Sequence, residues 1–155
     1  MTPQLFSIVG SAASNPQVQL FWAWIALCLA VALHVLDEAS TGFLSVYNPT
    51  VLALRQRRRW LPLPVFTFGV WLAGLIAATL VVASLSIFVL RDSPWIRPLA
   101  YIFAAIMLAN GLGHVAGTIA GHTVKSVRFP RPMPGFYSSP LLLFASGYLL
   151  HELCV

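Results

Sequence analysis

Three long stretches without a charged side chain constrain this sequence most. Residues 18–36, 65–90 and about 98–121 contain no Asp, Glu, Lys or Arg. A transmembrane helix needs about 20 predominantly apolar residues, so each stretch is long enough to cross a bilayer. The chain is therefore predicted to be an all-α integral membrane protein.

The proportion of charged residues supports the same conclusion. Only 8% of the 155 residues are Asp, Glu, Lys or Arg, against about a quarter in a typical soluble domain. So few charges do not cover a water-exposed surface, and residues 1–155 are predicted to form a single membrane-embedded domain. The net charge of +5 lies in the loops between spans and not on a soluble basic surface, which argues against a nucleic-acid partner.

A shorter apolar stretch ends the chain. Residues 141–150 are apolar apart from Ser146, and His151 and Glu152 follow directly. The predicted fold is a bundle of four transmembrane helices, with spans at about 18–37, 65–90, 98–121 and 140–154. Because the last stretch is close to the lower length limit for a span, the alternative is three spans plus a re-entrant or peripheral C-terminal helix.

Basic residues are distributed unevenly among the loops. The first and third loops hold seven of the nine, which are Arg55, Arg57, Arg58, Arg59, Lys125, Arg128 and Arg131. The second loop is flanked by Arg91 and Arg97. Short loops rich in Lys and Arg stay in the cytoplasm, which predicts a multi-pass protein of the inner (plasma) membrane with both termini outside the cytoplasm. Residues 49–60 are predicted to form a basic helix on the lipid surface, with apolar side chains such as Val51 toward lipid.

Polar side chains recur at helical spacing in two of the predicted spans. In the third span they are Asn110, His114, Thr118 and His122, each four residues from the next. The first span ends with His34, Asp37 and Glu38. Residues four apart lie on one helical face, so each helix presents a polar ridge. In the predicted topology both helices run from the outside to the cytoplasm, which places the two ridges at the same depth.

The two ridges carry ionisable groups that lipid tolerates poorly. Such a group costs about 2.5 kcal/mol or more to insert, so it usually faces the bundle interior and pairs. Imidazole and carboxylate groups from two helices are suitable ligands for a divalent metal, either zinc or iron. The candidate metal ligands are His34, Asp37, Glu38, His114 and His122.

The same residues also allow chemistry without a metal. General acid–base catalysis would use His114 oriented by Glu38. In either case the candidate catalytic residues are His34, Glu38 and His114, with Asn110 and Thr118 as neighbouring polar contacts. A third interpretation is that the polar residues only hold the helices together.

The segment between the third and fourth spans is rich in proline. Residues 124–139 contain Pro130, Pro132, Pro134 and Gly135, which exclude a regular helix. The segment is either a cytoplasmic linker or a lid over the site. As a lid, it would use Arg128 or Arg131 to hold an anionic headgroup or phosphate, and Tyr137 to donate a hydrogen bond.

Three short motifs occur in order along the chain. They are His34-Val35-Leu36-Asp37-Glu38, Asn110-Gly111-Leu112-Gly113-His114 and Tyr137-Ser138-Ser139-Pro140. They resemble the signature, the Asn-x-x-x-His element and the Tyr-x-Pro-Gly element of the HXXEE family of small bacterial membrane proteins. Asp37 replaces the first glutamate of that signature, and Leu141 stands where the family has glycine. The resemblance implies a polytopic helical bundle with a polar site and implies no particular reaction.

Three functions are compatible with these features. The first is a membrane-embedded enzyme, with or without a metal, that acts on a lipidic or hydrophobic substrate. The second is a transporter that handles a cation or proton, and the third is an accessory subunit of a larger membrane complex. A transporter is expected to contain an inverted repeat, and none is evident in the sequence. The enzyme is therefore favoured, with membrane lipids as partners and a homo-oligomer or larger complex as the expected assembly.

Overall fold

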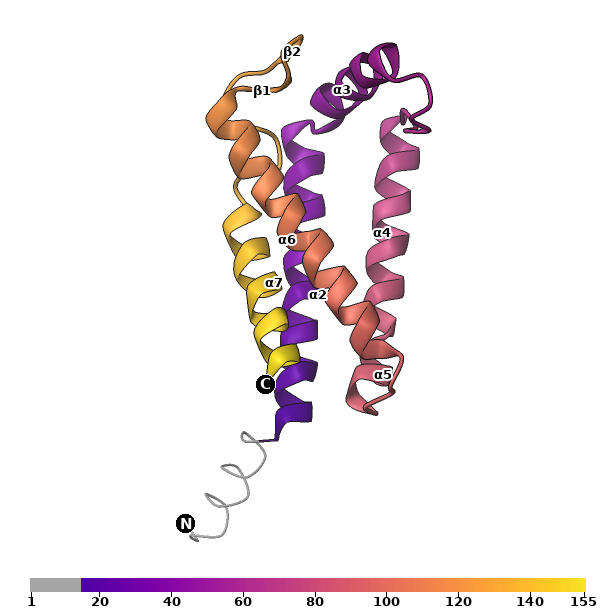
Figure 1. The fold of residues 1–155 in the computed structure, drawn as a ribbon, viewed down its shortest axis with the longest axis vertical. Helices are drawn as coiled ribbons and strands as arrows, with labels where there is room; N and C mark the ends of the chain where they lie inside the picture. The colour runs from indigo at the N-terminus through magenta and orange to yellow at the C-terminus, as the bar shows by residue number, and fades with distance from the viewer. Residues whose placement is uncertain (1–14) are drawn as a thin grey trace, which may run out of the picture.

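The computed structural model describes residues 15–155, which form a helical bundle with a small two-stranded hairpin at one end (Figure 1). The long helices are α2 (Pro16–Thr41), α4 (Phe68–Ser84), α6 (Ile96–Ala120) and α7 (Ser139–Cys154). The shorter elements are α3 (Leu44–Arg57), α5 (Ser86–Leu90), β1 (His122–Val124) and β2 (Val127–Arg128). The predicted all-α fold class is confirmed.

Helix α2 has a cap at each end. The Asn15 side chain accepts a hydrogen bond of 2.9 Å from the Gln17 N–H, and proline occupies the first turn. The helix ends at Gly42, whose φ of 77° lies in the left-handed region and whose N–H donates to the Glu38 carbonyl. Because the helix continues to Thr41, beyond the predicted end at residue 37, Glu38 lies on a regular helical turn.

The four long helices alternate in direction. Helices α2 and α6 run from the end that holds the C-terminus toward the end that holds α3, and α4 and α7 run back (Figure 1). Helix α7 packs against both α2 and α6, whereas α4 packs against α2. Gly111 allows α6 and α7 to approach closely, because a β-carbon there would lie 2.9 Å from Leu143 Cδ2. The parallel course of α2 and α6 brings their C-terminal halves to the same level.

The apolar core fills the bundle between α2, α6 and α7. Its largest fully buried apolar side chains include Trp24, Leu27, Leu142 and Leu149. Helix α4 contributes little to this core, since Trp71 is the one buried residue among those of α4. Large apolar side chains of α4, such as Val70 and Leu80, are exposed. An apolar surface of this extent on a helix is suited to contact with lipid.

Three segments of the described chain are long and apolar enough to cross a membrane, namely Pro16–Thr41, Phe68–Leu90 and Ile96–Ala120. They correspond to the first three predicted spans. The predicted fourth span is the helix α7, whose 16 residues rise about 24 Å at 1.5 Å per residue. That length is less than the roughly 30 Å of bilayer hydrocarbon. Helix α7 is thus a member of the bundle, and a fourth complete crossing stays a prediction.

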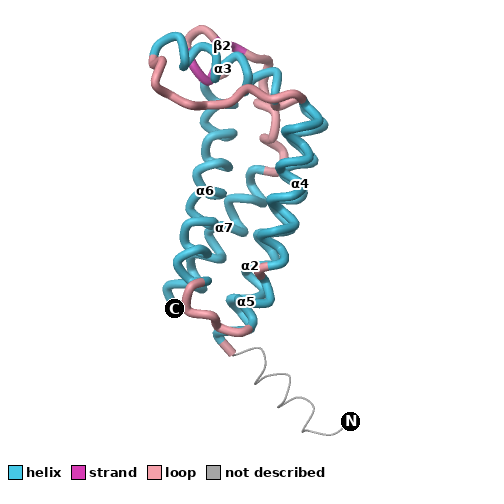
Figure 2. Tube along the Cα trace, turned by 90° about the vertical axis from the view of Figure 1, so that its right-hand side faces the viewer, coloured by secondary structure: helices cyan, strands magenta, loops and turns pink. Residues whose placement is uncertain are grey.

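The end of the bundle away from the C-terminus carries α3 and the hairpin, which contact each other (Figure 2). Helix α3 begins at Leu44 and ends at Arg57, earlier at both ends than the predicted surface helix at 49–60. The prediction that Val51 faces lipid is wrong, because Val51 is buried where α3 meets the rest of the protein. Residues 124–138 form no helix, as predicted from their prolines. The hairpin that β1 and β2 form at the start of this segment was not predicted.

Candidate metal centre

Three ionisable side chains, which we call the His/Glu cluster, meet between α2 and α6. His34 and Glu38 lie one turn apart on α2, and His114 comes from α6. Glu38 Oε1 lies 3.1 Å from His114 Nε2 and 3.6 Å from His34 Nε2. The two imidazole rings meet edge to face, with centroids 4.8 Å apart. All three side chains are buried, with exposed fractions of 5% or less. The predicted meeting of the two polar ridges is therefore confirmed for these residues.

A chain of hydrogen bonds fixes the orientation of His34. Ser138, which directly precedes α7, donates its N–H and its hydroxyl to Asp37 Oδ2, each at 2.8 Å. The same hydroxyl oxygen lies 2.8 Å from His34 Nδ1. Because the hydroxyl has one proton and gives it to Asp37, His34 Nδ1 is the donor in this contact. His34 Nε2 lies 3.3 Å from the Asn110 amide nitrogen and 3.6 Å from Glu38 Oε1.

His114 has one nitrogen directed at Glu38 and one without a partner. Its Nδ1 atom is buried and has no hydrogen-bond partner within residues 15–155. The Phe43 ring covers the imidazole, with centroids 5.6 Å apart. Buried polar atoms are nearly always satisfied in native proteins, and an exception is common where a site takes a further ligand or proton. The unpaired nitrogen is therefore left free for a further ligand or proton.

Two hydroxyl groups anchor the proline-rich segment beside the cluster. Thr41 Oγ1, at the end of α2, accepts from the Gly135 N–H at 3.1 Å. Thr118 Oγ1, on α6, accepts from the Met133 N–H at 3.0 Å. The segment is thus attached to both helices that carry the cluster. We call residues 129–138 the covering segment, because Gly135 lies against His114 and Glu38.

Gly135 makes the closest approach of this segment to the cluster. Its φ of 84° lies in the left-handed region, where residues with a side chain are strained. A β-carbon at this position would lie 2.6 Å from His114 Cε1, 2.8 Å from His114 Nδ1 and 2.9 Å from Glu38 Cγ. Glycine is therefore required here both by the backbone conformation and by the lack of space.

The two separations between Glu38 and the histidines of the cluster are close to those of metal ligands. One nitrogen or oxygen from each of the three residues lies within 4.8 Å of the others. Two ligands bound to a tetrahedral zinc ion at about 2.0–2.1 Å lie roughly 3.3 Å apart, and the observed separations are 3.1 and 3.6 Å. A histidine ligand usually donates its second N–H to another group, as His34 does to Ser138. The cluster can therefore hold a divalent metal ion through two imidazoles and one carboxylate.

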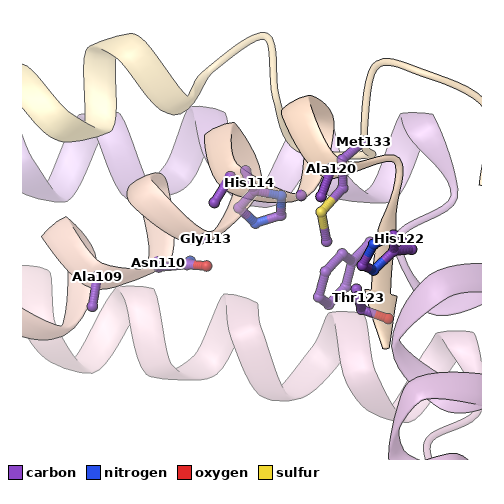
Figure 3. A pocket seen from close by; sticks show the side chains of 11 residues that line it. Ala109, Asn110, Gly113, His114, Ala120, His122, Thr123 and Met133 are labelled. Carbon is purple, nitrogen blue, oxygen red and sulfur yellow. The ribbon is translucent and has the colours of Figure 1, made fainter. Parts of the chain in front are cut away.

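His114 also lines a cavity of about 520 Å³ beside α6 (Figure 3). Small residues of α6 form much of its wall: Ala109, Gly113, Ala116, Gly117 and Ala120. Asn110 and His114 are the polar α6 residues in the wall, and Phe43 and Met133 close other sides. The volume lies within the range of small-molecule sites, about 300–1,000 Å³. The cluster therefore adjoins a space that can accept part of a ligand.

Three predicted metal or polar-contact residues have other positions in the structure. The prediction that His122 continues the helical ridge is wrong, because Gly121 adopts a left-handed φ of 74° and ends α6. His122 instead begins β1 and lines the cavity away from the cluster. Asp37 binds Ser138 instead of joining the ligand atoms. Thr118, predicted as a polar neighbour, holds the backbone of the covering segment.

The three residues predicted to contact substrate all lie on the covering segment or the hairpin. Arg128 is in β2, and Tyr137 is 69% exposed. The Arg131 guanidinium packs beside Gly121, because a β-carbon on that glycine would lie 3.0 Å from Arg131 Nε. Within residues 15–155 none of the three forms a hydrogen bond or ion pair with the His/Glu cluster. Their roles in binding substrate stay predictions.

Sequence reasoning missed Ser138, Gly135 and Thr41. One signal for Gly135 was present, because it follows Pro134 and a Pro-Gly pair is typical of a turn. No comparable signal marked Ser138 or Thr41, whose partners lie about a hundred residues away in the sequence.

Comparison with known proteins supports the assignment suggested by the three motifs. A family model described as a protein of unknown function with an HXXEE motif matches residues 22–150. No curated protein and no solved structure gives a significant match to the chain. The matched range covers most of the chain and contains His34, Glu38 and His114. The chain therefore belongs to the HXXEE family of proteins of unknown function.

Proposed function

We propose that this protein is a metal-dependent membrane enzyme that acts on a lipidic or hydrophobic substrate. The observation that carries the proposal is the convergence of His34, Glu38 and His114 at a buried point that adjoins a cavity. His34 and Glu38 would bind the ion from α2 and His114 from α6. A metal held by these three residues would supply Lewis-acid chemistry, which polarises a water molecule or a substrate oxygen.

The burial of Glu38 favours a metal over simple helix packing. An isolated carboxylate within a membrane bundle is costly unless a positive charge compensates it. The ordered chain from Asp37 through Ser138 to His34 favours the tautomer that presents the Nε2 lone pair to the cluster. Two histidines and one carboxylate are ligands for zinc and also for iron(II). Either ion is compatible with the proposal.

The cavity favours a hydrophobic substrate. Its wall is mainly alanine, glycine and other apolar side chains, and it belongs to a helix apolar enough to span the membrane. A substrate dissolved in lipid would reach such a space without crossing water. His114 belongs to both the cluster and the cavity wall, so it connects the proposed metal to the proposed substrate.

The test of this function is the metal content of the purified full-length protein. We expect about one equivalent of zinc or iron per chain, and its loss in both His34→Ala and His114→Ala. His151→Ala is the matched control, because His151 lies on α7 near the C-terminus and should leave the metal content unchanged. A wild-type protein that contains no metal and binds none when zinc is added would rule out the proposal and favour an accessory role.

Ser138→Ala tests the proposed orientation of His34. The substitution removes the hydroxyl that links Asp37 to His34 Nδ1. Loss of such an outer contact typically lowers metal affinity about tenfold to a hundredfold, and we expect an effect in this range from zinc titration against a competing chelator. Ser146→Ala is the control, since its buried hydroxyl bonds only the Leu142 carbonyl of its own helix among the described contacts. Equal affinity of Ser138→Ala and wild type would show that the chain of bonds does not orient His34.

The proposed orientation places the α3 end of the bundle in the cytoplasm, with both termini outside. The support is the bias of basic residues toward that end. A reporter enzyme that is active only outside the cytoplasm should be inactive when inserted at Arg59 and active when inserted at Asp92. The reverse pattern would invert the orientation without altering the geometry of the cluster.

A further inference from the structure

We propose that the cavity beside α6 binds a single anionic membrane lipid, with its hydrocarbon chain along α6 and its headgroup near His122 and Arg131. The inference rests on the proposed function and names the substrate class of that site. Its evidence is the shape of the cavity, the position of His114 in the cavity wall and the distribution of charge at the α3 end of the bundle.

The cavity has the length of one membrane leaflet. Its wall follows α6 from Ala109 to Ala120, a rise of about 16 Å at 1.5 Å per residue. Half of the hydrocarbon thickness of a bilayer is about 15 Å. Apart from Asn110 and His114, the α6 residues along this wall are alanine or glycine, so a lipid chain can lie directly against the helix backbone. Gly113 is an example, since a β-carbon there would meet nothing within 4 Å.

His114 connects the cavity with the His/Glu cluster. Its side chain lines the cavity although only 2% of the residue is exposed, and its Nδ1 atom, which has no partner within residues 15–155, lies on the side of Gly135. His114 lies about 9 Å below the end of α6 at Ala120, from six residues at 1.5 Å each. A lipid whose headgroup sits at the end of α6 would therefore bring its chain, below the headgroup, to the His/Glu cluster.

The charge near the end of α6 is complementary to an anionic headgroup. Lys125, Arg128 and Arg131 follow the end of α6, four further arginines lie in 55–59 at the same end of the bundle, and the intervals 39–91 and 93–151 contain no Asp or Glu. The Arg131 guanidinium packs beside Gly121. In the sequence, Gly121 is the residue between Ala120 and His122, which both line the cavity. Arginine binds phosphate oxygens through charge-assisted hydrogen bonds. A zwitterionic lipid of the same chain length would gain less from this surface, which selects the anionic class.

The experiment uses the full-length protein reconstituted in bilayers of phosphatidylglycerol and phosphatidylcholine in equal amounts. The protein is then released into mild detergent, and retained lipid is counted by native mass spectrometry. We expect one retained phosphatidylglycerol per chain and at least about a tenfold preference over phosphatidylcholine, given the attraction between basic side chains and anionic lipids. Equal retention of the two lipids, or retention of neither, would overturn the inference.

Two pairs of variants locate the lipid. Gly113→Leu fills the cavity and should abolish retention, whereas Gly147→Leu adds the same side chain to an exposed position on α7, also with nothing within 4 Å of a β-carbon, and should retain the lipid. Arg131→Gln should reduce the preference for phosphatidylglycerol severalfold, whereas Arg91→Gln, before α6, should not. Unchanged retention in Gly113→Leu would place the lipid elsewhere and overturn the inference.

Metal content measured on the same samples separates this inference from the proposed function. Wild type that binds zinc but shows no lipid selectivity would contradict only the lipid inference. Wild type that binds no metal can still retain phosphatidylglycerol in a way that Gly113→Leu and Arg131→Gln reduce. That result would contradict the proposed metal-dependent enzyme and would leave a lipid-binding protein. Gly113→Leu is expected to keep the zinc content of wild type, because Gly113 lies on the cavity wall and not in the His/Glu cluster.

Discussion

Replacing Glu38 with glutamine is expected to lower the zinc affinity of the protein by about a hundredfold or more. Loss of an outer contact alone costs about tenfold to a hundredfold, and Glu38 supplies the one carboxylate of the His/Glu cluster. Its Oε1 atom is the point to which both imidazoles are directed, at 3.1 and 3.6 Å. Glutamine keeps the size of the side chain but loses the charge that a divalent cation requires. Zinc titration against a competing chelator measures the change.

The stability of the metal-free variant distinguishes lost binding from lost folding. A buried carboxylate is costly to desolvate, and its replacement by a neutral group of the same shape is often neutral or stabilising. We therefore expect metal-free Glu38→Gln to melt at the same temperature as metal-free wild type or higher. Glu152→Gln, near the C-terminal end of α7, is the matched control and should change neither quantity. Wild-type zinc affinity in Glu38→Gln would show that the cluster is not the metal site.

The antiparallel course of the long helices could be predicted from the sequence, because a chain that crosses lipid must meet simple requirements. A stretch such as 65–90 has no charged residue and must form a helix, since its backbone polar groups need internal hydrogen bonds. The direction of each helix then follows from alternation along the chain. His34, Glu38 and His114 could be placed together on this basis alone, although 76 residues separate Glu38 from His114.

The ends of the elements could not be predicted in the same way. The polar residues from Asn110 to His122 are each four residues apart, and this spacing is what a helix that continued through His122 would show. Gly121 ends the helix by adopting a left-handed conformation, which a glycine permits but does not require. Ser138 reaches Asp37 and His34 because α7 begins beside this part of α2. The position of α7 along α2 is determined by tertiary packing, and no local sequence pattern indicates it. Of the two further predicted ligands, His122 therefore lies in β1, and Asp37 lies beside the cluster but binds Ser138.

Gly135→Ala is expected to have the second large effect, because it strains the backbone and also displaces the cluster. The strain of a left-handed residue with a side chain is about 1–2 kcal/mol. The new methyl group would in addition collide with His114 and with Glu38 Cγ. His114 has little room to move away, since its ring is buried between the rings of His34 and Phe43. We expect a lower melting temperature and a loss of zinc affinity of at least about tenfold, in line with the effect of disturbing ligand orientation.

Gly42→Ala separates these two contributions. Gly42 has a similar φ of 77°, but the nearest atom to a β-carbon there is Ser45 Oγ at 4.0 Å. This variant should therefore show the strain, as a comparable fall in melting temperature, without the collision and with wild-type zinc affinity. If Gly135→Ala and Gly42→Ala bind zinc equally well, the covering segment does not hold the metal ligands in position, and Gly135 is required only by its backbone conformation. If only Gly135→Ala loses zinc, the proline-rich segment is part of the site, because its fit against His114 and Glu38 holds the ligand atoms in place.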